Sequence, residues 1–430
     1  MSAEAVLAAA RLLWPAPATV TIGRTGPGQA EGNARRLEFV LVPSAADPRL
    51  VVPLRPLPAA AAVARSHAAP GSWQAAARTA LMATAFASGA GHVLLRDRLV
   101  VDLPEGAVGL DEHLSDVLGR TVVIGLRLGP PRANRKPVLQ VVTLDGQLVA
   151  YAKLGVSPLT DALVTAEGEA LARLGTAILG DVRVPEVLHA GTWQGHPLLV
   201  QAALPVRRSS GPDAAARITR AMVAVAGSAA GSAADSVALA DLPWWERTHD
   251  VVRRLPVAGP AAELASAGDL LTAFASRRLP AGAWHGDWNP GNCAVVRDRV
   301  LVWDWERYET GVPAGFDALH LCLQSAIGSC ADPSAAAGRM MAEAAELLAP
   351  FGVAPVDARL VGMLYLWGLG ARYAKDDQVA AGAAVGRLET WLLPILHEAL
   401  SAESAASAQP AAASARPAAA SAAADPAKER

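Results

Sequence analysis

Residues 284–292 read Trp-His-Gly-Asp-Trp-Asn-Pro-Gly-Asn, and the apolar segment Val300–Trp303 follows them and leads into Asp304. Within this stretch Asn292 lies five residues after Asp287, and Asp304 lies 17 residues after it. One tight loop can therefore present the Asp287 carboxylate and the Asn292 amide to the same site. The longer interval leaves room for a hairpin that returns the Asp304 carboxylate to their side.

These three polar side chains have the chemistry that phosphoryl transfer requires. One carboxylate must orient the attacking hydroxyl, and an amide oxygen with a second carboxylate must hold Mg²⁺ against the phosphates. We therefore expect Asp287 to act as the base, and Asn292 and Asp304 to bind the metal. His285 is expected to hold the loop through a hydrogen bond, without shuttling protons.

The order His285-Gly286-Asp287, then Pro290-Gly291-Asn292 and a delayed strand aspartate, resembles the aminoglycoside phosphotransferase and choline kinase family. The resemblance covers about residues 110–400. It implies an α+β, bilobal protein kinase-like fold with a small antiparallel-sheet lobe and a mainly helical large lobe. It also implies a reaction: transfer of the terminal phosphate of ATP or GTP, with Mg²⁺, to a hydroxyl of a sugar, aminosugar, aminoglycoside or amino alcohol.

Composition favours a cytoplasmic protein with a small-molecule partner. The chain has 430 residues and a formal charge of −2, which gives no electrostatic reason to expect nucleic acid or an anionic membrane as partner. Its three cysteines cannot all pair with one another and lack metal-ligand spacing, as expected for free thiols in a reducing compartment. The N-terminus lacks the basic region of a signal peptide, and the longest uncharged run, Thr79–Leu95, is too short for a membrane span.

Pattern and composition divide the chain into four segments. They are a cap-like N-terminal extension at 1–108, a small lobe with its hinge at 109–205, a helical large lobe at 206–400, and an Ala/Ser/Pro tail at 401–430 that is expected to be disordered. Within the extension, periodicity predicts strands at 19–22, 37–42 and 92–103 and a helix at 72–87. The extension resembles, in position and size, a cap found in some bacterial sugar-kinase relatives.

Strands are predicted in the small lobe at 121–128, 138–143 and 148–154. The loop Gly129–Pro137 lies where a kinase covers the nucleotide phosphates, but it holds one glycine and several basic residues. On the third strand, period two places Tyr151 and Lys153 on one face. Lysine occurs only at positions 136, 153, 375 and 428, which makes a strand lysine notable.

The resemblance implies that Lys153 contacts the nucleotide phosphates, and we expect Tyr151 to stack on the base. The alternative for Lys153 is a solvated residue on an edge strand. A helix is predicted from Thr160 or Asp161 to Leu174, and it carries Glu167 on its apolar stripe with Leu171 and Leu174. A carboxylate there needs a partner, and Lys153 is the expected one. Glu169, the competing residue, points about 160° away at roughly 100° per residue.

Residues 201–205 are expected to form the hinge between the lobes, with the backbone of Gln201 and Ala203 contacting the base. On the acceptor side, adjacent Trp244 and Trp245 could form an aromatic wall for a sugar ring or an amine, and the alternative is a place in the core. Glu306 resembles a glutamate of the choline kinase branch and is a candidate ligand for metal or substrate. Asp317 corresponds to the family's aspartate that braces the catalytic loop.

Two other functions are alternatives to that of a small-molecule kinase. A protein kinase is disfavoured because His-Gly-Asp replaces His-Arg-Asp and no Ala-Pro-Glu segment follows. A nucleotide-binding pseudoenzyme that acts as an interaction module is disfavoured because Lys153, Asp287, Asn292 and Asp304 are all present. These motifs leave open the acceptor, the choice between ATP and GTP, the role of residues 1–108, the oligomeric state and any part in antibiotic resistance.

Overall fold

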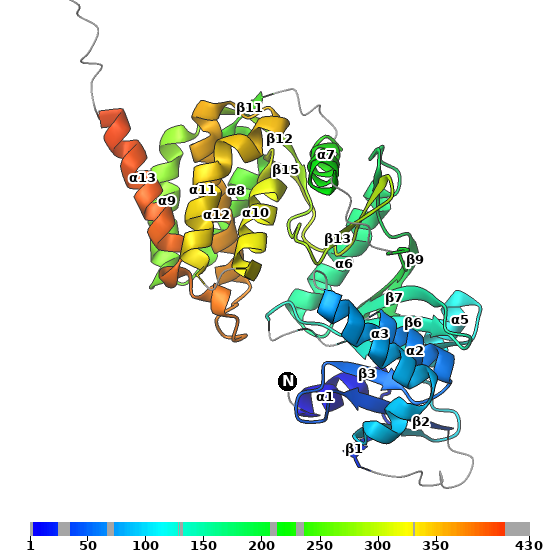
Figure 1. The fold of residues 1–430 in the computed structure, drawn as a ribbon. Helices are drawn as coiled ribbons and strands as arrows, with labels where there is room; N and C mark the ends of the chain where they lie inside the picture. Colours follow the sequence, from blue (N-terminus) through cyan, green and yellow to red (C-terminus); the bar gives the residue numbers. More distant parts are fainter. Residues whose placement is uncertain are drawn as a thin grey trace, which may run out of the picture.

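A computed structural model of the chain describes residues 3–24, 35–66, 73–127, 129, 132–206, 213–228, 236–329 and 332–408. It has two lobes, one built on a large sheet and the other mainly of helices (Figure 1). The bilobal α+β architecture expected from the sequence is thus confirmed.

A nine-stranded antiparallel sheet forms the first lobe, in the order β1-β4-β2-β3-β5-β6-β7-β10-β9. In chain order its strands are β1 Thr19–Gly23, β2 Arg35–Val42, β3 Leu50–Pro53, β4 Arg98–Leu103, β5 Val122–Arg127, β6 Val138–Thr143, β7 Leu148–Leu154, β9 Val187–Trp193 and β10 His196–Ala202. The strands of the extension join those of the small lobe directly, because Leu50 and Val51 of β3 pair with Arg127 and Leu126 of β5. Strands from both sides of the predicted boundary at residue 108 therefore belong to one sheet.

Helices cover both faces of this sheet. Helices α1 Ala3–Leu13 and α5 Leu110–Leu118 share one core with β-strand residues such as Leu41 and Leu139. Helix α2 Leu57–Arg65 lies on the opposite face, where its alanines share a second core with Val40 and Val142, and α3 Trp73–Ala87 packs on α2. Figure 1 shows α2 and α3 side by side over the strands.

The predicted strand at 92–103 is wrong in its first part. Residues Ala90–Leu94 form the short helix α4, and β4 begins only at Arg98. The helical turn places the ring of His92 against Phe86 of α3, 5.5 Å between centroids, so this segment packs on a helix and does not join the sheet.

Helix α6 Pro158–Leu174 follows β7 and begins earlier than predicted. Its N-cap is Ser157, whose hydroxyl accepts a hydrogen bond from the Thr160 amide while the Thr160 hydroxyl accepts one from the Ser157 amide. Pro158 occupies the first helical turn, where its missing N–H costs nothing. A small sheet, β8 Val182–Arg183 with β14 Arg299–Val302 and β13 Cys293–Val296, links this lobe to the next.

The second lobe contains the remaining elements. Its helices are α7 Ala214–Ala226, α8 Pro243–Arg254, α9 Pro260–Leu271, α10 Phe316–Ser329, α11 Pro333–Leu348, α12 Pro355–Lys375 and α13 Leu392–Ala408, and its sheet pairs β11 Ser236–Ala238, β12 Arg278–Trp284 and β15 Glu309–Pro313. Short 3₁₀ turns lie at Leu239–Asp241, Thr272–Phe274, Ala349–Phe351, Ala384–Gly386 and Leu388–Thr390. Helix α12 is buried over most of its length and forms the centre of the lobe.

The tail predicted from residue 401 is wrong in its first part, because α13 continues to Ala408. Alanine, serine and glutamate are compatible with a helix that is already formed. Residues 409–430 lie outside the described part of the chain. Among described helices, none alone has the length and apolar character of a membrane span, and only the pair Pro333–Phe351 and Pro355–Lys375, bent by 111°, meets both criteria when taken together.

Candidate active site

The loop between β12 and β13 is fixed by groups from two helices. Both oxygens of Asp317, in the first turn of α10, accept backbone N–H bonds, from His285 at 2.7 Å and from Gly286 at 3.1 Å. On the other side, Arg372 of α12 donates to the Gly286 carbonyl at 2.6 Å. Asp317 therefore braces the loop as the resemblance implied. Burial raises the pKa of Asp317 to about 7, although these two N–H bonds act to lower it.

Gly286 occupies a position that only glycine fits. Its φ is 82°, in the left-handed region, and a Cβ there would lie 2.2 Å from the Arg307 carbonyl oxygen. A larger residue would push the loop off the turn that follows Asp304. Steric exclusion of a side chain therefore explains the glycine between His285 and Asp287, and no catalytic role is needed.

His285 holds the loop with both ring nitrogens. Nε2 donates to the Trp303 carbonyl at 3.0 Å, so Nδ1 is the acceptor for the Asp287 amide at 3.2 Å. Burial lowers the pKa of His285 to about 4, against the pull of the Asp287 charge. A neutral ring with both nitrogens engaged positions the loop and moves no proton.

The Asp287 carboxylate is held at both oxygens yet remains accessible. Asn292 Nδ2 donates to Oδ2 at 3.0 Å, and His320 Nε2 of α10 faces Oδ1 at 3.1 Å. The side chain is 31% exposed, so a substrate hydroxyl can approach it. Burial acts to raise the pKa of Asp287, but the hydrogen bond and charge interaction with His320 outweigh it and the pKa lies below the usual value. Asp287 is ionised at neutral pH.

His320 is itself oriented by a buried tyrosine. Its Nδ1 lies 2.8 Å from the Tyr365 hydroxyl of α12, and both side chains are at most 1% exposed. Because the hydroxyl can donate to Nδ1, Nε2 carries the proton that points at Asp287. The result is a chain of two hydrogen bonds, Tyr365 to His320 to Asp287.

Lys153 lies at the centre of the second group of site residues. Its Nζ is 2.7 and 2.6 Å from the two oxygens of Glu167 and 2.5 Å from Asp304 Oδ1. The predicted pair of Lys153 and Glu167 is therefore present in the structure, whereas Glu169 is exposed. Burial disfavours the charge on Lys153, but the neighbouring carboxylates of Asp304 and Glu167 outweigh it and raise the lysine pKa.

Asp304 adopts a backbone conformation that is uncommon for its residue type. Its φ is 71°, which turns the chain sharply at the end of β14. Burial would raise the pKa of Asp304, but the charges of Lys153 and Lys136 lower it. The side chain is ionised and 31% exposed, and it is close enough to Asp287 for its charge to act on the pKa of that residue.

Three carboxylates in this space form a cluster of oxygen donors. Oxygens of Glu167, Asp304 and Glu306 lie within 4.8 Å of one another. Glu306 is buried and pairs with Lys136, which comes from the loop between β5 and β6, and it accepts a hydrogen bond from Asn134 of that loop at 3.0 Å. The predicted phosphate-covering loop thus reaches the large lobe in its described part, 132–137. Carboxylate oxygens are the ligands that Mg²⁺ prefers, so the donor set fits this ion.

One backbone group of the predicted hinge is already engaged within the protein. The Ala203 amide donates to the Val149 carbonyl at 3.0 Å and is therefore engaged, so Ala203 has only its carbonyl to offer a base. The next amide, that of Leu204, makes no backbone hydrogen bond within the described residues. Tyr151 lies directly opposite Gln201 across β7 and β10, on the same face as Lys153. Burial raises the pKa of Tyr151, which stays neutral.

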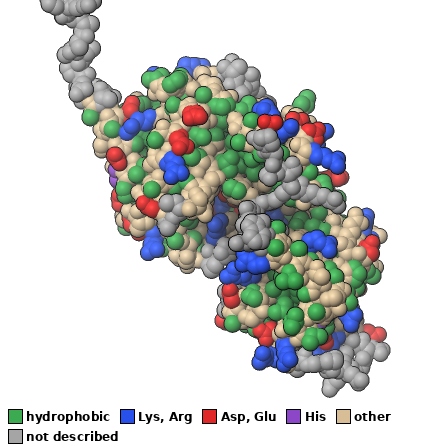
Figure 2. Space-filling view, viewed as in Figure 1, with side chains coloured by type: hydrophobic (Ala, Val, Ile, Leu, Met, Phe, Trp, Pro, Cys, Tyr) green, Lys and Arg blue, Asp and Glu red, His purple; other side chains and the backbone are tan. Residues whose placement is uncertain are grey.

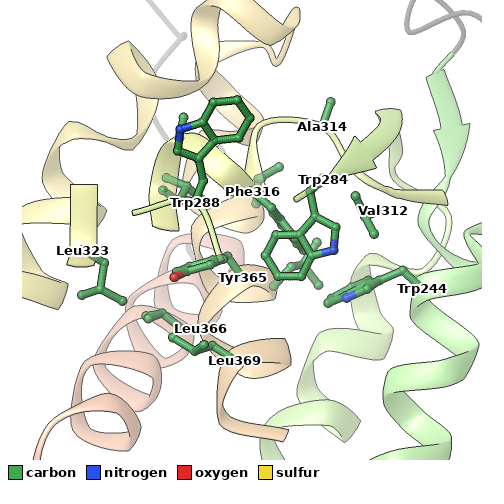
Figure 3. Packing of buried hydrophobic residues seen from close by; sticks show 14 of the residues in the cluster. Trp244, Trp284, Trp288, Val312, Ala314, Phe316, Leu323, Tyr365, Leu366 and Leu369 are labelled. Carbon is green, nitrogen blue, oxygen red and sulfur yellow. The ribbon is translucent and has the colours of Figure 1, made fainter. Parts of the chain in front are cut away.

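Of the two alternatives for Trp244 and Trp245, the structure shows a place in the core, and the aromatic wall is ruled out. Trp244 and Trp245 are 3% and 7% exposed and pack in the large-lobe core against Trp367, with ring centroids 6.0 and 5.5 Å away. Figure 3 shows Trp244 within this core, together with Trp284 and Phe316. Helix α8 starts at Pro243, and its strongly amphipathic sequence turns both indoles inward. Neither faces a ligand.

Three site residues were not predicted from the sequence: Lys136, His320 and Arg372. Lys136 could have been found by the same scarcity of lysine that drew attention to Lys153. His320 lies three residues after Asp317, hence on the same face of a helix already expected to meet the loop. Arg372 lies 86 residues from its partner Gly286, and no local pattern marks it.

Comparison with known protein families identifies one that matches this chain. A model described as the phosphotransferase enzyme family matches residues 137–356, just over half of the chain. No curated protein matches the sequence.

Among solved structures, the aminoglycoside phosphotransferase APH(4)-Ia, as a thermostable mutant, is 13% identical; it covers 68% of this chain and 99% of its own, with a TM-score of 0.44. The gentamicin complex of APH(2")-IIa is 13% identical and covers 67% and 94%, with a TM-score of 0.39. A protein from Thermobifida fusca YX-ER1, provisionally named fructosamine-3-kinase, is 19% identical and covers 68% and 98%, with a TM-score of 0.36.

Proposed function

The chain belongs to the phosphotransferase enzyme family, and from this premise we propose that it moves the terminal phosphate of ATP or GTP to a hydroxyl of a sugar, aminosugar, aminoglycoside or amino alcohol. The protein is a small-molecule kinase with a bilobal, α+β, protein kinase-like fold. The proposal includes a cytoplasmic site of action and no nucleic-acid or membrane partner, as expected from the charge and cysteine content.

One observation carries the proposal: Asp287 is ionised, restrained at both oxygens, partly exposed, and close enough to Asp304 for the charge of Asp304 to act on it. In the mechanism Asp287 accepts the hydrogen bond of the acceptor hydroxyl and aligns it with the terminal phosphate. Because His320 and Asn292 restrain the carboxylate, little reorientation is needed when the substrate arrives. His285 holds the loop and exchanges no proton.

The nucleotide is proposed to lie between the lobes. Figure 2 shows a hollow between the two lobes, with Lys or Arg side chains visible in it. Lys153, oriented by Glu167, would contact the phosphates, and Tyr151 and the hinge would contact the base. Leu204 offers the backbone amide that Ala203 lacks.

Asn292 and Asp304 would hold Mg²⁺, with Glu306 as a further candidate ligand. The amide nitrogen of Asn292 donates to Asp287, so its oxygen is the atom left to face a cation. Glu167, Asp304 and Glu306 carry three negative charges against the two positive charges of Lys136 and Lys153, which favours an added cation. Bound Mg²⁺ would neutralise phosphate charge.

The test is nucleotide turnover by the purified protein with Mg²⁺ against a panel of sugars, aminosugars, aminoglycosides and choline-like amines. We expect acceptor-dependent release of the diphosphate, and we expect Asp287→Asn to abolish it while nucleotide binding is kept. Asp298→Asn, in the exposed turn between β13 and β14, is a matched control that should keep full turnover.

Different failures separate the proposal from its rivals. Equal turnover by Asp287→Asn would contradict the assigned base. Tight nucleotide binding with no turnover across the whole panel would support a pseudoenzyme. Absence of nucleotide binding would contradict the proposed position of the nucleotide at Lys153.

A further inference from the structure

The large sheet has a gap at the junction between the extension and the small lobe. Strand β3 ends at Pro53 after only four residues, so it pairs with β2 no further than Phe39 and with β5 no further than Val51. Both neighbours continue beyond it, β2 through residues 35–38 and β5 through residues 122–125. A cavity of about 900 Å³ lies there, which we call the seam cavity; it is lined from both sides of the junction, by Glu38, Leu54 and Ile124 among others.

The walls of the seam cavity carry an excess of positive charge. The lining includes two acidic residues, Glu38 and Asp111, and five arginines, at positions 24, 36, 55, 96 and 98. Arg24 and Arg36 have carboxylates within 4 Å, from Asp97 and from Glu38 and Asp102. Within the described part of the chain, the other three arginines form no ion pair.

Arg98 is the most constrained of these three. It is 8% exposed, and its guanidinium donates only to backbone carbonyls, chiefly those of Leu95 and His92. Burial lowers the pKa of Arg98, and the charges of Glu38 and Asp97, which form no ion pair with it, offset this only in part. An anion directly beside Arg98 would therefore be favoured. Arg55 and Arg96 are exposed at the rim and can turn toward such a group.

His92 supplies unused hydrogen-bonding capacity at the same place. Both ring nitrogens are shielded from solvent, and neither has a hydrogen-bond partner within the described residues. Burial, then the charges of Arg98 and Arg55, lowers the pKa of His92 and keeps it neutral, so one nitrogen can donate and the other accept. Phe39, Leu54, Val93 and Ile124 give the cavity an apolar part.

We propose that the seam cavity binds a small anionic molecule in which an acidic group, phosphate or carboxylate, is attached to an apolar body. Arg55, Arg96 and Arg98 meet the acidic group, and His92 completes its hydrogen bonds. The volume lies within the range of about 300–1,000 Å³ typical of small-molecule sites. Because the walls come from both the extension and the small lobe, the ligand ties the two together.

The test uses the full-length protein with the active site filled by Mg²⁺ and a non-hydrolysable ATP analogue. Phenyl phosphate and phenylacetate are titrated calorimetrically, and benzyl alcohol serves as the uncharged probe. We expect at least one anion to bind at one site and to raise the melting temperature, and the alcohol to do neither. The variant Arg55→Ala/Arg96→Ala changes exposed residues only and should weaken binding by about tenfold or more, the scale of one lost charge-assisted hydrogen bond.

Arg120→Ala is the matched control, since Arg120 is an exposed arginine of the same lobe outside the seam cavity. It should bind the anion like the wild type. The proposal is overturned if neither anion binds, if the double variant binds as tightly as the wild type, or if Arg120→Ala loses as much affinity. Binding that appears only without the nucleotide analogue also overturns it, because the anion would then occupy the active site. No step of this test requires phosphoryl transfer, so the proposal stands or fails independently of the proposed reaction.

Discussion

At the scale of single residues, the site depends on groups that orient Asp287. Asn292 and His320 each contact one oxygen of its carboxylate, and Tyr365 in turn contacts His320. A base held at both oxygens keeps its remaining lone pairs directed to the open side, where a hydroxyl can reach them. His320 is a positioning residue in this arrangement, because it contacts the base and not the substrate.

Replacing His320 should therefore impair turnover more than binding. We expect His320→Ala to lower kcat by about 10- to 100-fold, the equivalent of the roughly 1.5–3 kcal/mol of a hydrogen bond to a charged group. The KM for nucleotide should stay near the wild-type value, and Tyr365→Phe should show a smaller loss of the same kind. Steady-state kinetics with the acceptor found by screening measures both constants.

His397→Ala, a half-exposed histidine of α13, is the control and should retain wild-type kinetics. A His320→Ala enzyme with unchanged kcat, or with a raised KM alone, would contradict the positioning role. Recovery of kcat by His320→Asn, which keeps a donor, would distinguish orientation of Asp287 from a general loss of packing.

We expect Lys136 to contact the nucleotide, since its partner Glu306 belongs to the carboxylate cluster around Lys153. Lys136→Ala removes one positive charge from the proposed phosphate site and leaves Glu306 buried without its ion pair. We expect the KM for nucleotide to rise by about tenfold, the scale of a lost charged hydrogen bond, with a smaller change in kcat. Arg120→Ala, an exposed residue of the same lobe outside this loop, is the control.

Adding Glu306→Gln to Lys136→Ala separates two causes. If the loss arises only because Glu306 is left unpaired, the double variant should regain wild-type KM. If Lys136 contacts phosphate, the raised KM should persist. An unchanged KM in the single variant would exclude Lys136 from the nucleotide site.

At the scale of elements, close packing between α2 and β5 joins the extension to the small lobe. A Cβ on Gly125 would lie 2.4 Å from Val63 Cγ1 and 2.8 Å from Val63 Cγ2, so glycine lets the helix approach the strand. We expect Gly125→Ala to destabilise the protein by about 1–3 kcal/mol, the usual effect of overpacking a core. Urea unfolding of purified variants measures the change.

The pair Gly125→Ala/Val63→Ala tests the cause of that loss. Removing the two methyl groups of Val63 makes room for the new Cβ, so the double variant should be more stable than the sum of the single effects predicts. Strictly additive losses would mean that the strain arises elsewhere. Gly129→Ala, where a Cβ meets no atom of the described residues within 4 Å, is the control.

Elements with a regular hydrophobic period were predictable, and elements defined by their neighbours were not. Period two placed Tyr151 and Lys153 together, and the helical stripe placed Glu167 inward, because both patterns report which face is buried. The engaged amide of Ala203 could not be predicted, because its partner Val149 lies 54 residues away and no local pattern reveals it. The two alternatives for Trp244 and Trp245 could not be separated, because an aromatic pair has the same sequence signal in a core as at a ligand.

At the scale of the whole molecule, the extension and the small lobe share one sheet and two hydrophobic cores. Each of the two cores beside the large sheet contains residues from both sides of position 108, as Leu13 and Phe39 share a core with Ile124 and Leu139. The second core likewise joins the alanines of α2 to Val142. A segment-by-segment interpretation of composition could not detect this, because sheet order is set by pairing between distant strands.

Separating the two parts should therefore abolish folding of the small lobe. The cut falls between exposed Val108 and buried Gly109, and the fragment 109–430 would expose the apolar side chains of both cores. We expect this fragment to aggregate or to unfold without a cooperative transition, as judged by gel filtration and thermal melting, and to bind no nucleotide. Co-expression with residues 1–108 should restore a soluble, cooperatively unfolding complex, because the missing strands can pair in trans. A monomeric fragment that melts cooperatively and binds nucleotide by itself would show that the extension is a dispensable addition to a complete kinase lobe.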